Sequence, residues 1–409
     1  MLSSETIQVV KATTPALKEH GNAITTRMYE LLFKHHPELK NIFNMSHQAT
    51  GMQARSLADA IYQYALHIEN LEAVIPLVER VAQKHAGLDI RPEHYPIVGK
   101  YLLRAIEDVL GDAATDEVIE AWGEAYQLLA NVFIRREQEI YHTGATQKGG
   151  WEGFRNFVIS RKVKESSMIT SFYLKPEDRK AIAGFEPGQY LTFKMNIPGL
   201  EHTVLRNYSL SDSPDKDYYR VSIKLEPGVT DPEEYPMGVA SNYFHDHLQE
   251  GSVVPVHIPT GNFFLNKELS LPVVLISGGV GQTPLMSMLN TLVAEDSKRA
   301  VWYIHGTRNG KEHAFKDHVK SIDQQYDHIN SYICYERPGP NDVLGEDYDA
   351  KGMINLDLIQ KLLPGKEADF YFCGPQVFMR MLYQSLTAWG VPEERIHFEF
   401  FGPTTEITE

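Results

Sequence analysis

His85 is the residue whose type and position raise the first chemical question. In the segment that ends VAQKHAG it follows Leu77 and Val81 at intervals of four residues, so in a helix the three side chains share one face. An imidazole on such a face is either a satisfied packing residue or a metal ligand. The spacing therefore predicts a helix with His85 on its apolar side, and it leaves both interpretations open.

Four other side chains of the first third have the properties of a haem pocket. Such a pocket needs a hydrogen-bond donor, an aromatic ring and apolar filler around the iron-bound ligand. Tyr29 offers a hydroxyl and Phe43 a ring, while Gln53 and Leu57 lie four residues apart on one predicted helix and so face the same way. Each of the four can also be explained as an ordinary core residue, but core packing does not predict that all four occur together.

The segment Arg206-Asn207-Tyr208-Ser209 matches the flavin-binding signature of ferredoxin-reductase-like domains. On a strand, Arg206 and Tyr208 share a face, so a guanidinium can meet a pyrophosphate while a phenol ring packs on the isoalloxazine. Ser209 points elsewhere, as a hydroxyl near the flavin N5 would.

Two further segments support a flavin site. Tyr190 in PGQY is expected near the flavin, and Gly238 and Ser241 in GVASNYF can bring backbone N–H groups to phosphates. The alternative is that Tyr190 and Tyr208 are core aromatic residues of a barrel.

A glycine-rich run, SGGVGQTP at 277–284, lies between an apolar strand and a helix, the context of a nucleotide-phosphate loop. It is not GxGxxG, which argues against an ordinary Rossmann dehydrogenase, but it resembles the reductase version of the loop. That resemblance implies that a nicotinamide nucleotide is lined by Gly278, Gly279, Val280, Gly281, Gln282 and Thr283. Cys373, Gly374 and Pro375 end a later strand, where ligands of such sheets bind, so Cys373 is expected to contact the nicotinamide side.

The hydrophobic pattern divides the chain into three predicted domains that would position these residues. Residues 1–143 have helical periodicity, with Ser3 or Ser4 as a cap, Pro37 as a stop, and helices near 51–68, 71–86, 94–110 and 114–141. Residues 151–268 contain short strands that suggest an antiparallel barrel or sandwich. Residues 269–409 alternate strands and helices, which predicts an α/β domain with a parallel sheet.

Composition excludes several classes of protein. A net charge of −15 leaves no basic stripe for nucleic acid, and no apolar run of membrane-spanning length occurs. With only Cys334 and Cys373, and without an apolar leader, the chain is expected to be cytoplasmic and not inserted in a membrane. A monomer is also expected.

The segments PELKNIFNMS, VAQKHAGLDIRPEHYPIVG and EAWGEAYQLLANVFIRREQEIY resemble the globin domain of flavohaemoglobins, and the resemblance extends to the C-terminus. It implies a globin fold, then an antiparallel FAD domain, then an NAD(P)-binding domain. It also implies His85 as the proximal iron ligand, with Tyr95 and Glu137 as a relay behind it. Beside His85, Lys84 is implied to influence the redox centre.

On the distal side the resemblance implies that Tyr29 and Gln53 donate hydrogen bonds to bound dioxygen, with Leu57 and Phe43 shaping access. The C-terminal segment FEFFGP is implied to close the flavin site through Glu399, Phe400, Phe401, Gly402 and Pro403. Without the resemblance, Glu137 between charged neighbours would be interpreted as part of a solvated helix face.

The expected cofactors are haem b, FAD and NADH or NADPH, and the expected activity is nitric oxide dioxygenase, converting NO and O2 to nitrate. Two alternatives stay open: an oxygen-binding or sensing globin with a maintenance reductase, and a soluble flavin or ferric reductase. An acidic, proline-rich stretch at 226–237 departs from the family pattern. Arg308 is either a partner for the 2′-phosphate of NADPH or a solvated loop charge.

Overall fold

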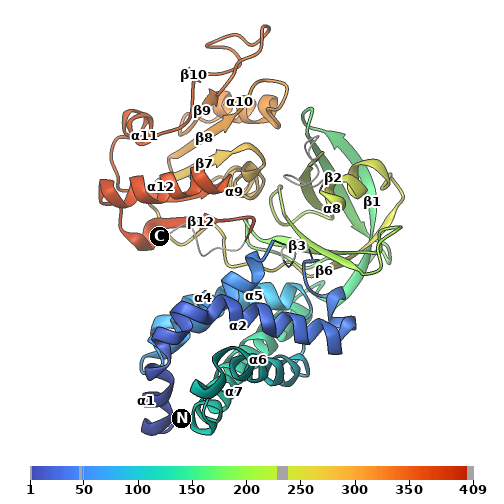
Figure 1. Ribbon diagram of the computed structural model, residues 1–409. Helices are drawn as coiled ribbons and strands as arrows, with labels where there is room; N and C mark the ends of the chain where they lie inside the picture. Colours follow the sequence, from blue (N-terminus) through green and yellow to red (C-terminus); the bar gives the residue numbers. More distant parts are fainter. Residues whose placement is uncertain (1, 46–47, 49, 228–237, 403–409) are drawn as a thin grey trace. The chain divides into compact units, whose positions relative to one another are not determined.

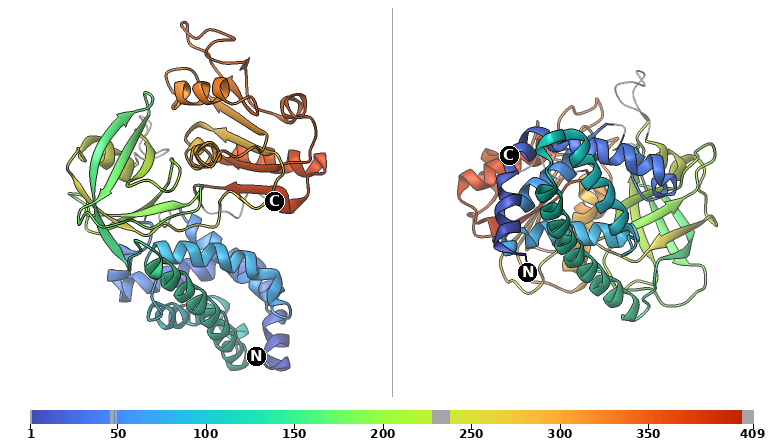
Figure 2. Two further views of the ribbon diagram at one scale, coloured as in Figure 1. Left: turned by 180° about the vertical axis from the view of Figure 1, so that it is seen from behind. Right: turned by 60° about the horizontal axis from the view of Figure 1, so that its bottom comes forward.

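The structure is a computed structural model that describes residues 2–45, 48, 50–227 and 238–402. The chain forms two compact units (Figures 1 and 2), and each is described by itself. The first unit comprises residues 1–147, 151–153 and 194–205, and the second comprises residues 148–150, 154–193 and 206–409. Pro403 and residues 228–237 of the acidic stretch lie outside the described residues.

The first unit is helical, as predicted. Its elements are α1 (Ser4–Ala12), α2 (Thr14–His35), η1 (Pro37–Asn41), α4 (Met52–Leu66), η2 (Leu71–Val74), α5 (Ile75–Gly87), α6 (His94–Leu110), η3 (Gly111–Ala113) and α7 (Asp116–Thr146). The Ser3 hydroxyl caps α1 by accepting from the Thr6 amide at 3.0 Å. The predicted helical stretch before Pro37 is divided at Thr13, because Pro15 lacks an N–H and is placed in the first turn of a new helix that starts at Thr14. The last helix extends to Thr146 rather than 141.

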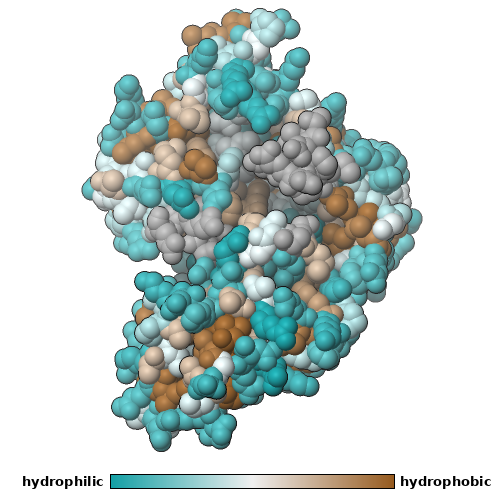
Figure 3. Space-filling model, in the orientation of Figure 1, coloured by the Kyte–Doolittle hydropathy of each residue, from teal (hydrophilic) through white to brown (hydrophobic). Residues whose placement is uncertain are grey.

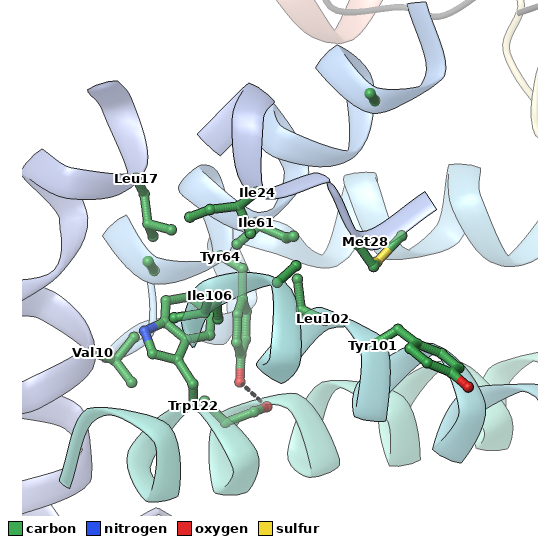
Figure 4. Packing of buried hydrophobic residues seen from close by; sticks show 14 of the residues in the cluster. Val10, Leu17, Ile24, Met28, Ile61, Tyr64, Tyr101, Leu102, Ile106 and Trp122 are labelled. Atoms are coloured by element: carbon green, nitrogen blue, oxygen red, sulfur yellow. Dashed lines mark hydrogen bonds between the residues drawn. The ribbon is translucent and has the colours of Figure 1, made fainter. Parts of the chain in front are cut away.

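One hydrophobic core holds these helices together (Figure 4). Tyr64 of α4 lies in it and donates its hydroxyl hydrogen to the Ala125 carbonyl of α7 at 2.8 Å, so this buried phenol is satisfied. Side chains from five helices fill the rest; the fully buried ones that Figure 4 labels include Val10, Ile24, Met28, Leu102, Ile106 and Trp122. This core fixes α6 and α7, and α5 packs against α7, so the three helices form a scaffold for the side chains between them.

A six-stranded antiparallel sheet follows the helices, and most of its residues belong to the second unit. Its strands are β1 (Phe154–Lys164), β2 (Ile169–Pro176), β3 (Tyr190–Met195), β4 (Val204–Ser209), β5 (Tyr219–Lys224) and β6 (Val253–His257), in the order β4-β3-β6-β1-β2-β5. Helix α8 (Val239–Asp246) packs on the sheet through Phe244, whose ring centroid lies 5.1 Å from that of Phe193 and 5.3 Å from that of Phe172. The predicted antiparallel domain is confirmed.

A parallel sheet follows, with helices on both faces (Figures 1 and 2). Its elements are β7 (Val273–Gly278), η4 (Gly279–Gly281), α9 (Gln282–Ala294), β8 (Val301–Thr307), α10 (Lys316–Gln325), β9 (Ile329–Tyr335), β10 (Ala350–Lys351), α11 (Leu356–Leu362), β11 (Asp369–Cys373), α12 (Gln376–Trp389), η5 (Glu393–Arg395) and β12 (Ile396–Glu399). The strand order is β10-β9-β8-β7-β11-β12.

Strand β7 explains the two-sided covering. Val273 and Leu275 pack with α9 and α10, whereas Val274 and Ile276 pack with α11 and α12. A strand covered on both faces must be apolar at every position, and the run VVLI meets that requirement. The predicted α/β domain is confirmed.

No helix within the described ranges combines the length and the apolar composition needed to cross a bilayer. The face shown in Figure 3 is mostly hydrophilic, with apolar residues in scattered patches.

Candidate functional site

Helix α5 carries His85 in its last turn. Val78, Ala82 and Ala86 are its most buried side chains, at intervals of four residues, and they set its packed face. The predicted stripe that ends at His85 lies beside this face, and the His85 side chain remains 31% exposed. Lys84, one position earlier, is exposed. The imidazole is therefore held at the margin of the core, where it can meet both protein and a ligand.

A buried carboxylate holds one nitrogen of this imidazole. Glu137 of α7 is 1% exposed, and its Oε1 lies 2.8 Å from His85 Nδ1. Tyr95 of α6 donates its hydroxyl hydrogen to the same oxygen at 2.5 Å and lies 3.1 Å from His85 Nδ1. Burial, and then the charge of Glu137, raise the pKa of Tyr95, so the phenol keeps its proton. Three helices thus bring these residues together, and Glu137 is not part of a solvated face.

Phe133 belongs to this group and was not predicted. Its ring centroid lies 5.7 Å from that of His85 and 6.4 Å from that of Tyr95. Phe133 and Glu137 are four residues apart on α7, so both face the imidazole. The four-residue spacing from Glu137 is the sequence signal that indicates Phe133 as a neighbour of the imidazole.

The predicted distal residues form a second group. Tyr29 of α2 is 7% exposed, and its ring lies 5.6 Å from Phe43 and 5.8 Å from Phe33 between centroids. Gln48 and Gln53 hydrogen-bond its hydroxyl, and burial raises the pKa of Tyr29 above its usual value. Leu57 packs against the same core. Gln48 and Phe33 were not predicted, since neither carries a distinguishing sequence pattern.

The residues present fit a haem. Because Glu137 bonds Nδ1, His85 offers Nε2 as the nitrogen that can bind a metal, the usual arrangement of a ligating histidine. Nε2 of Gln48 is buried without a hydrogen-bond partner among the described residues, although a buried donor normally has one. A ligand that accepts a hydrogen bond beside Tyr29 would satisfy it.

Strand β4 presents the flavin signature with the predicted alternation. Ser209 is buried, whereas Arg206 and Tyr208 are half-buried. Burial lowers the pKa of Arg206 and raises the pKa of Tyr208, and the Arg206 charge partly opposes the latter shift. Asn207 accepts the Thr192 hydroxyl hydrogen at 2.9 Å. A desolvated guanidinium favours an anionic partner, so the strand fits a pyrophosphate.

Tyr208 also packs against other aromatic rings, as the alternative interpretation of a core aromatic residue of the barrel requires. Its ring centroid lies 5.3 Å from Phe244 and 5.7 Å from Phe193, both edge-on. The ring is therefore braced on the barrel side and can serve as a rigid surface for a planar ligand.

Tyr190, at the start of β3, is anchored through its backbone. Its N–H donates to the Thr260 carbonyl at 2.9 Å, and the Thr260 N–H donates back at 3.1 Å. Burial raises the pKa of Tyr190, and the charge of Glu399 adds to this shift. A Cβ at Gly261 would lie 3.0 Å from the Tyr190 ring, and Gly261 has a φ of +118°, so the close approach requires glycine. Residues far apart in sequence thus meet at one site.

Helix α8 begins at the predicted phosphate-binding turn. The Ser241 hydroxyl donates to the Gly238 carbonyl at 2.9 Å and accepts from the Glu226 amide at 3.3 Å. A Cβ at Gly238 would lie 2.6 Å from Ser241 Oγ. Ser241 therefore fixes the turn, and the first amide groups of α8 are the donors that it offers to an anion.

The glycine-rich loop after β7 packs closely on the end of β11 and the residues that follow it. A Cβ at Gly281 would lie 2.2 Å from the Cys373 carbonyl oxygen, and one at Gly278 would lie 3.0 Å from Pro375. Gly279 has a φ of +55°, and a Cβ there would meet no atom within 4 Å. A Cβ at Gly374 would lie 2.7 Å from a ring carbon of Phe378. The loop fits a nucleotide that approaches the backbone closely.

Three predicted side chains of this loop face the protein. Gln282 is 1% exposed and accepts from the Tyr303 hydroxyl at 3.3 Å. Thr283 donates to the Val280 carbonyl at 3.0 Å, and Val280 itself packs against the α9 core. What these residues can offer a nucleotide is backbone N–H groups at the start of α9.

Cys373 ends β11 and pairs with Glu399 of β12 in parallel register. It is fully buried, and burial raises the pKa of its thiol well above the ordinary value. A reactive cysteine needs a lowered pKa, so the structure opposes a redox thiol. Beyond Glu399, Phe401 is 49% exposed, and the Gly402 amide donates to the Phe400 carbonyl at 2.8 Å.

Arg308, just after β8, is 70% exposed and lies 3.6 Å from Glu312 Oε1. An exposed pair at that distance is weak, so the guanidinium can exchange Glu312 for a phosphate.

Three family matches follow one another along the chain. They are the globin family at residues 26–133, the oxidoreductase FAD-binding domain at 156–265 and the oxidoreductase NAD-binding domain at 275–384. Each lies within the corresponding predicted domain. They confirm the predicted cofactor classes of haem, FAD and nicotinamide nucleotide, while the domain boundaries stay a prediction.

Relatives match over the full length. The chain is 52% identical over 407 residues to a flavohemoprotein of Bacillus cereus, with 100% of both chains covered. It is 52% identical over 402 residues to a flavohemoprotein of Halalkalibacterium halodurans, with 98% of this chain and 97% of that one covered.

Two solved structures are similar. A flavohemoglobin of Malassezia yamatoensis with bound FAD and haem has a TM-score of 0.85 and 27% identity, covering 98% of this chain and all of that one. The FAD/NAD-binding domain of nitric oxide dioxygenase from Vibrio cholerae has a TM-score of 0.54 and 34% identity, covering 61% of this chain and 99% of that one.

Proposed function

Because the chain belongs to the flavohemoprotein family, we propose that it is an NAD(P)H-dependent nitric oxide dioxygenase. Two NO and two O2 would be consumed per NAD(P)H, giving two nitrate ions, NAD(P)+ and one proton. When bound, the nicotinamide supplies a hydride, FAD accepts it and passes on single electrons, and haem iron uses them with oxygen. The similarity to the Vibrio nitric oxide dioxygenase domain supports this activity.

The observation that carries the proposal is the buried carboxylate behind His85. Glu137 Oε1 lies 2.8 Å from His85 Nδ1, so it holds a proton at that nitrogen and fixes the tautomer. An imidazole polarised in this way donates more electron density to iron through Nε2, which favours oxygen chemistry over simple storage. Tyr95 supports Glu137 by donating to the same oxygen, and it orients the carboxylate.

The distal residues would orient a diatomic ligand. Tyr29 keeps its proton because burial raises its pKa, so its hydroxyl can donate to a polarised oxygen atom. Gln48 and Gln53 hold the hydroxyl in place. Phe43 packs edge-on against Tyr29 and would limit the entry of water.

The second unit would bind and align the two nucleotides. Arg206 on β4 would pair with the FAD pyrophosphate, and Tyr208 and Tyr190 would pack on its ring. The loop at 278–281 would receive the nicotinamide nucleotide on backbone N–H groups. Cys373 would contribute a neutral, protonated thiol beside Glu399 and no redox chemistry of its own.

The test is NO consumption by the purified holoprotein under air. With NADH or NADPH we expect haem and flavin absorption bands and NO-dependent cofactor oxidation, with nitrate formed in equal amount to the NO consumed. Haem and flavin bands with reversible oxygen binding but no NO-dependent oxidation would replace the proposal with the oxygen-binding globin. Reduction of ferric chelates as the main activity would replace it with the reductase.

The His85→Ala variant tests the haem ligand separately from the flavin reductase. We expect it to lose the haem spectrum while NADH still reduces FAD, since the ligand and the reductase lie in different units. The control is His142→Ala, which removes an exposed imidazole from α7. A wild-type haem spectrum in His85→Ala would exclude His85 as the ligand.

A further inference from the structure

A hydrogen-bonded bridge joins the flavin strand to the helix behind the nucleotide loop. Asp212 lies three residues after Ser209, the end of β4. The Ser287 hydroxyl of α9 donates to the Asp212 carbonyl at 2.7 Å, and the Asn290 amide donates to Asp212 Oδ1 at 2.9 Å. Helix α9 starts directly after Gly281. The bridge therefore connects the two nucleotide-binding segments through one residue.

The partners on α9 are placed for this contact. Ser287 and Asn290 are three residues apart and so lie on one side of the helix. They are 0% and 8% exposed, on a helix whose other buried residues are mostly apolar. A buried polar group is costly unless it is paired, and Asp212 pairs with both.

The acceptor is itself held in position. Asp212 Oδ1 also accepts from the Ser213 amide at 2.9 Å, and Oδ2 accepts from the Tyr218 hydroxyl at 2.9 Å. Arg220 Nη1 lies 3.8 Å from Oδ2. The carboxylate thus cannot rotate without breaking other contacts.

His318 of α10 orients the amide of Asn290. Its Nε2 lies 2.7 Å from Asn290 Oδ1, so the amide oxygen is engaged and the amide nitrogen must face Asp212. Burial lowers the pKa of His318, and a neutral imidazole can donate this bond. The bridge has a defined direction from His318 through Asn290 to Asp212.

A cation–π contact adds a second link. The Arg220 guanidinium lies 5.1 Å from the ring centroid of Phe315, which precedes α10, and its Nε donates to the Ser211 hydroxyl at 3.2 Å. Phe315 has a φ of +60°, a conformation that a bulky residue adopts only when its surroundings impose it. The surroundings here include Arg220 of β5.

We propose that Asp212 and Asn290 are positioning residues that set the geometry of hydride transfer between the nicotinamide and the flavin. The inference deepens the proposed electron transfer and rests on it. In that step the C4–H bond of the dihydronicotinamide breaks with its electron pair, the hydride forms a bond to flavin N5, and solvent supplies one proton. The nicotinamide is oxidised and FAD is reduced to FADH2.

Hydride transfer is sensitive to such a bridge because the reacting atoms must lie about 3–3.5 Å apart, and a displacement of about 1 Å costs roughly 100-fold in rate. Neither residue is a predicted nucleotide contact. Loosening the bridge should therefore lower the limiting rate of flavin reduction and leave nucleotide affinity nearly unchanged.

The test compares Asn290→Asp with the double variant D212N/N290D. The single variant replaces the donor by a second carboxylate and creates repulsion at hydrogen-bond distance. The double variant restores a donor on residue 212 and an acceptor on residue 290, and its carboxylate on α9 can still accept from His318. The Ser213 amide loses its acceptor, because it donates to the same Asp212 oxygen as Asn290, so the recovery should be partial. The control is Asn330→Asp, which adds the same charge at an exposed position of β9.

Stopped-flow flavin reduction of the FAD-loaded protein by NADH, without oxygen and at pH 8, is the first measurement. We expect Asn290→Asp to lower the limiting rate about 10- to 100-fold, with the Kd for NADH within twofold, and the double variant to recover part of the lost rate. Hydrogen exchange of the same protein without NADH is the second measurement, and residues 282–294 should exchange faster in the single variant only.

A wild-type limiting rate in Asn290→Asp, or a double variant as slow as the single one, would overturn the proposal. If Asn290→Asp does not fold, Ser287→Ala takes its place, because it removes only a hydroxyl, and an unchanged limiting rate there would equally overturn it. Flavin reduction is measured without NO, so failure of the wild type to consume NO would refute the dioxygenase alone.

Discussion

The substitution Gly281→Ala should disturb the packing of the nucleotide loop strongly. The added Cβ would lie 2.2 Å from the Cys373 carbonyl oxygen, 2.4 Å from its carbonyl carbon and 2.6 Å from the Gly374 nitrogen. All three atoms are backbone, so no side chain can turn aside. The loop and the end of β11 must separate by about 1 Å or more before the contact becomes an ordinary van der Waals contact.

The expected cost follows from this displacement. Overpacking of a filled site destabilises a protein by about 1–3 kcal/mol, and each kcal/mol lowers the Tm of a unit of this size by about 2–4 °C. We therefore expect Gly281→Ala to melt about 2–12 °C below the wild type. A loop displaced by about 1 Å should also slow flavin reduction by NADH about 100-fold.

The matched control is Gly365→Ala. A Cβ there would meet no atom within 4 Å, and its φ lies outside the left-handed range, so its Tm and rate should equal those of the wild type. Circular dichroism melting and anaerobic stopped-flow reduction measure the two effects. Wild-type melting of Gly281→Ala would refute the packing argument, and a lowered Tm with unchanged flavin reduction would remove the loop from the nucleotide site.

Three further predictions concern other parts of the chain. Tyr29→Phe removes a hydrogen bond worth about 1.5–3 kcal/mol, so oxygen should dissociate roughly 10- to 150-fold faster from the ferrous protein in flash photolysis; an unchanged rate would exclude Tyr29 from the site. Arg308→Ala should raise the KM for NADPH several-fold and leave that for NADH unchanged, because only NADPH carries a 2′-phosphate; equal effects on both cofactors would make Arg308 a surface charge. Burial lowers the pKa of His313 to about 4, whereas the unfolded value is about 6.5, so between these values the unfolded chain binds a proton that the folded chain does not. His313 should therefore contribute about 3 kcal/mol to the fall in the free energy of unfolding as pH drops from 6.5 to 4, and urea titrations should show a shallower fall in His313→Gln; identical slopes would contradict this.

The local architecture was predictable because its determinants are local. Helical periodicity predicted α4, α5 and α6 to within a few residues, since the apolar positions of a helix repeat every three to four residues. Alternation along β4 predicted that Arg206 and Tyr208 share a face opposite Ser209. The glycine run after β7 predicted a loop whose backbone comes close to a ligand.

The role of Glu137 shows what the sequence left open. Glu137 and Arg136 are charged neighbours on one helix, yet Arg136 pairs with Glu79 at 2.6 Å near the surface whereas Glu137 is buried against His85. One residue turns a helix by about 100°, so the helical pattern separates the two side chains but cannot say which one meets a polar partner. That depends on Tyr95, 42 residues earlier.

The same reason applies to the contacts across the second unit. Asp212 and Asn290 are 78 residues apart, and the backbone of Cys373 reaches Gly281 only because β7 and β11 are neighbours in the sheet. A sequence determines which residues are glycine, aspartate or asparagine and which face of an element they occupy. Packing between distant elements decides whether a polar side chain is solvated or buried with a partner, because burial is set by neighbours that no local pattern encodes.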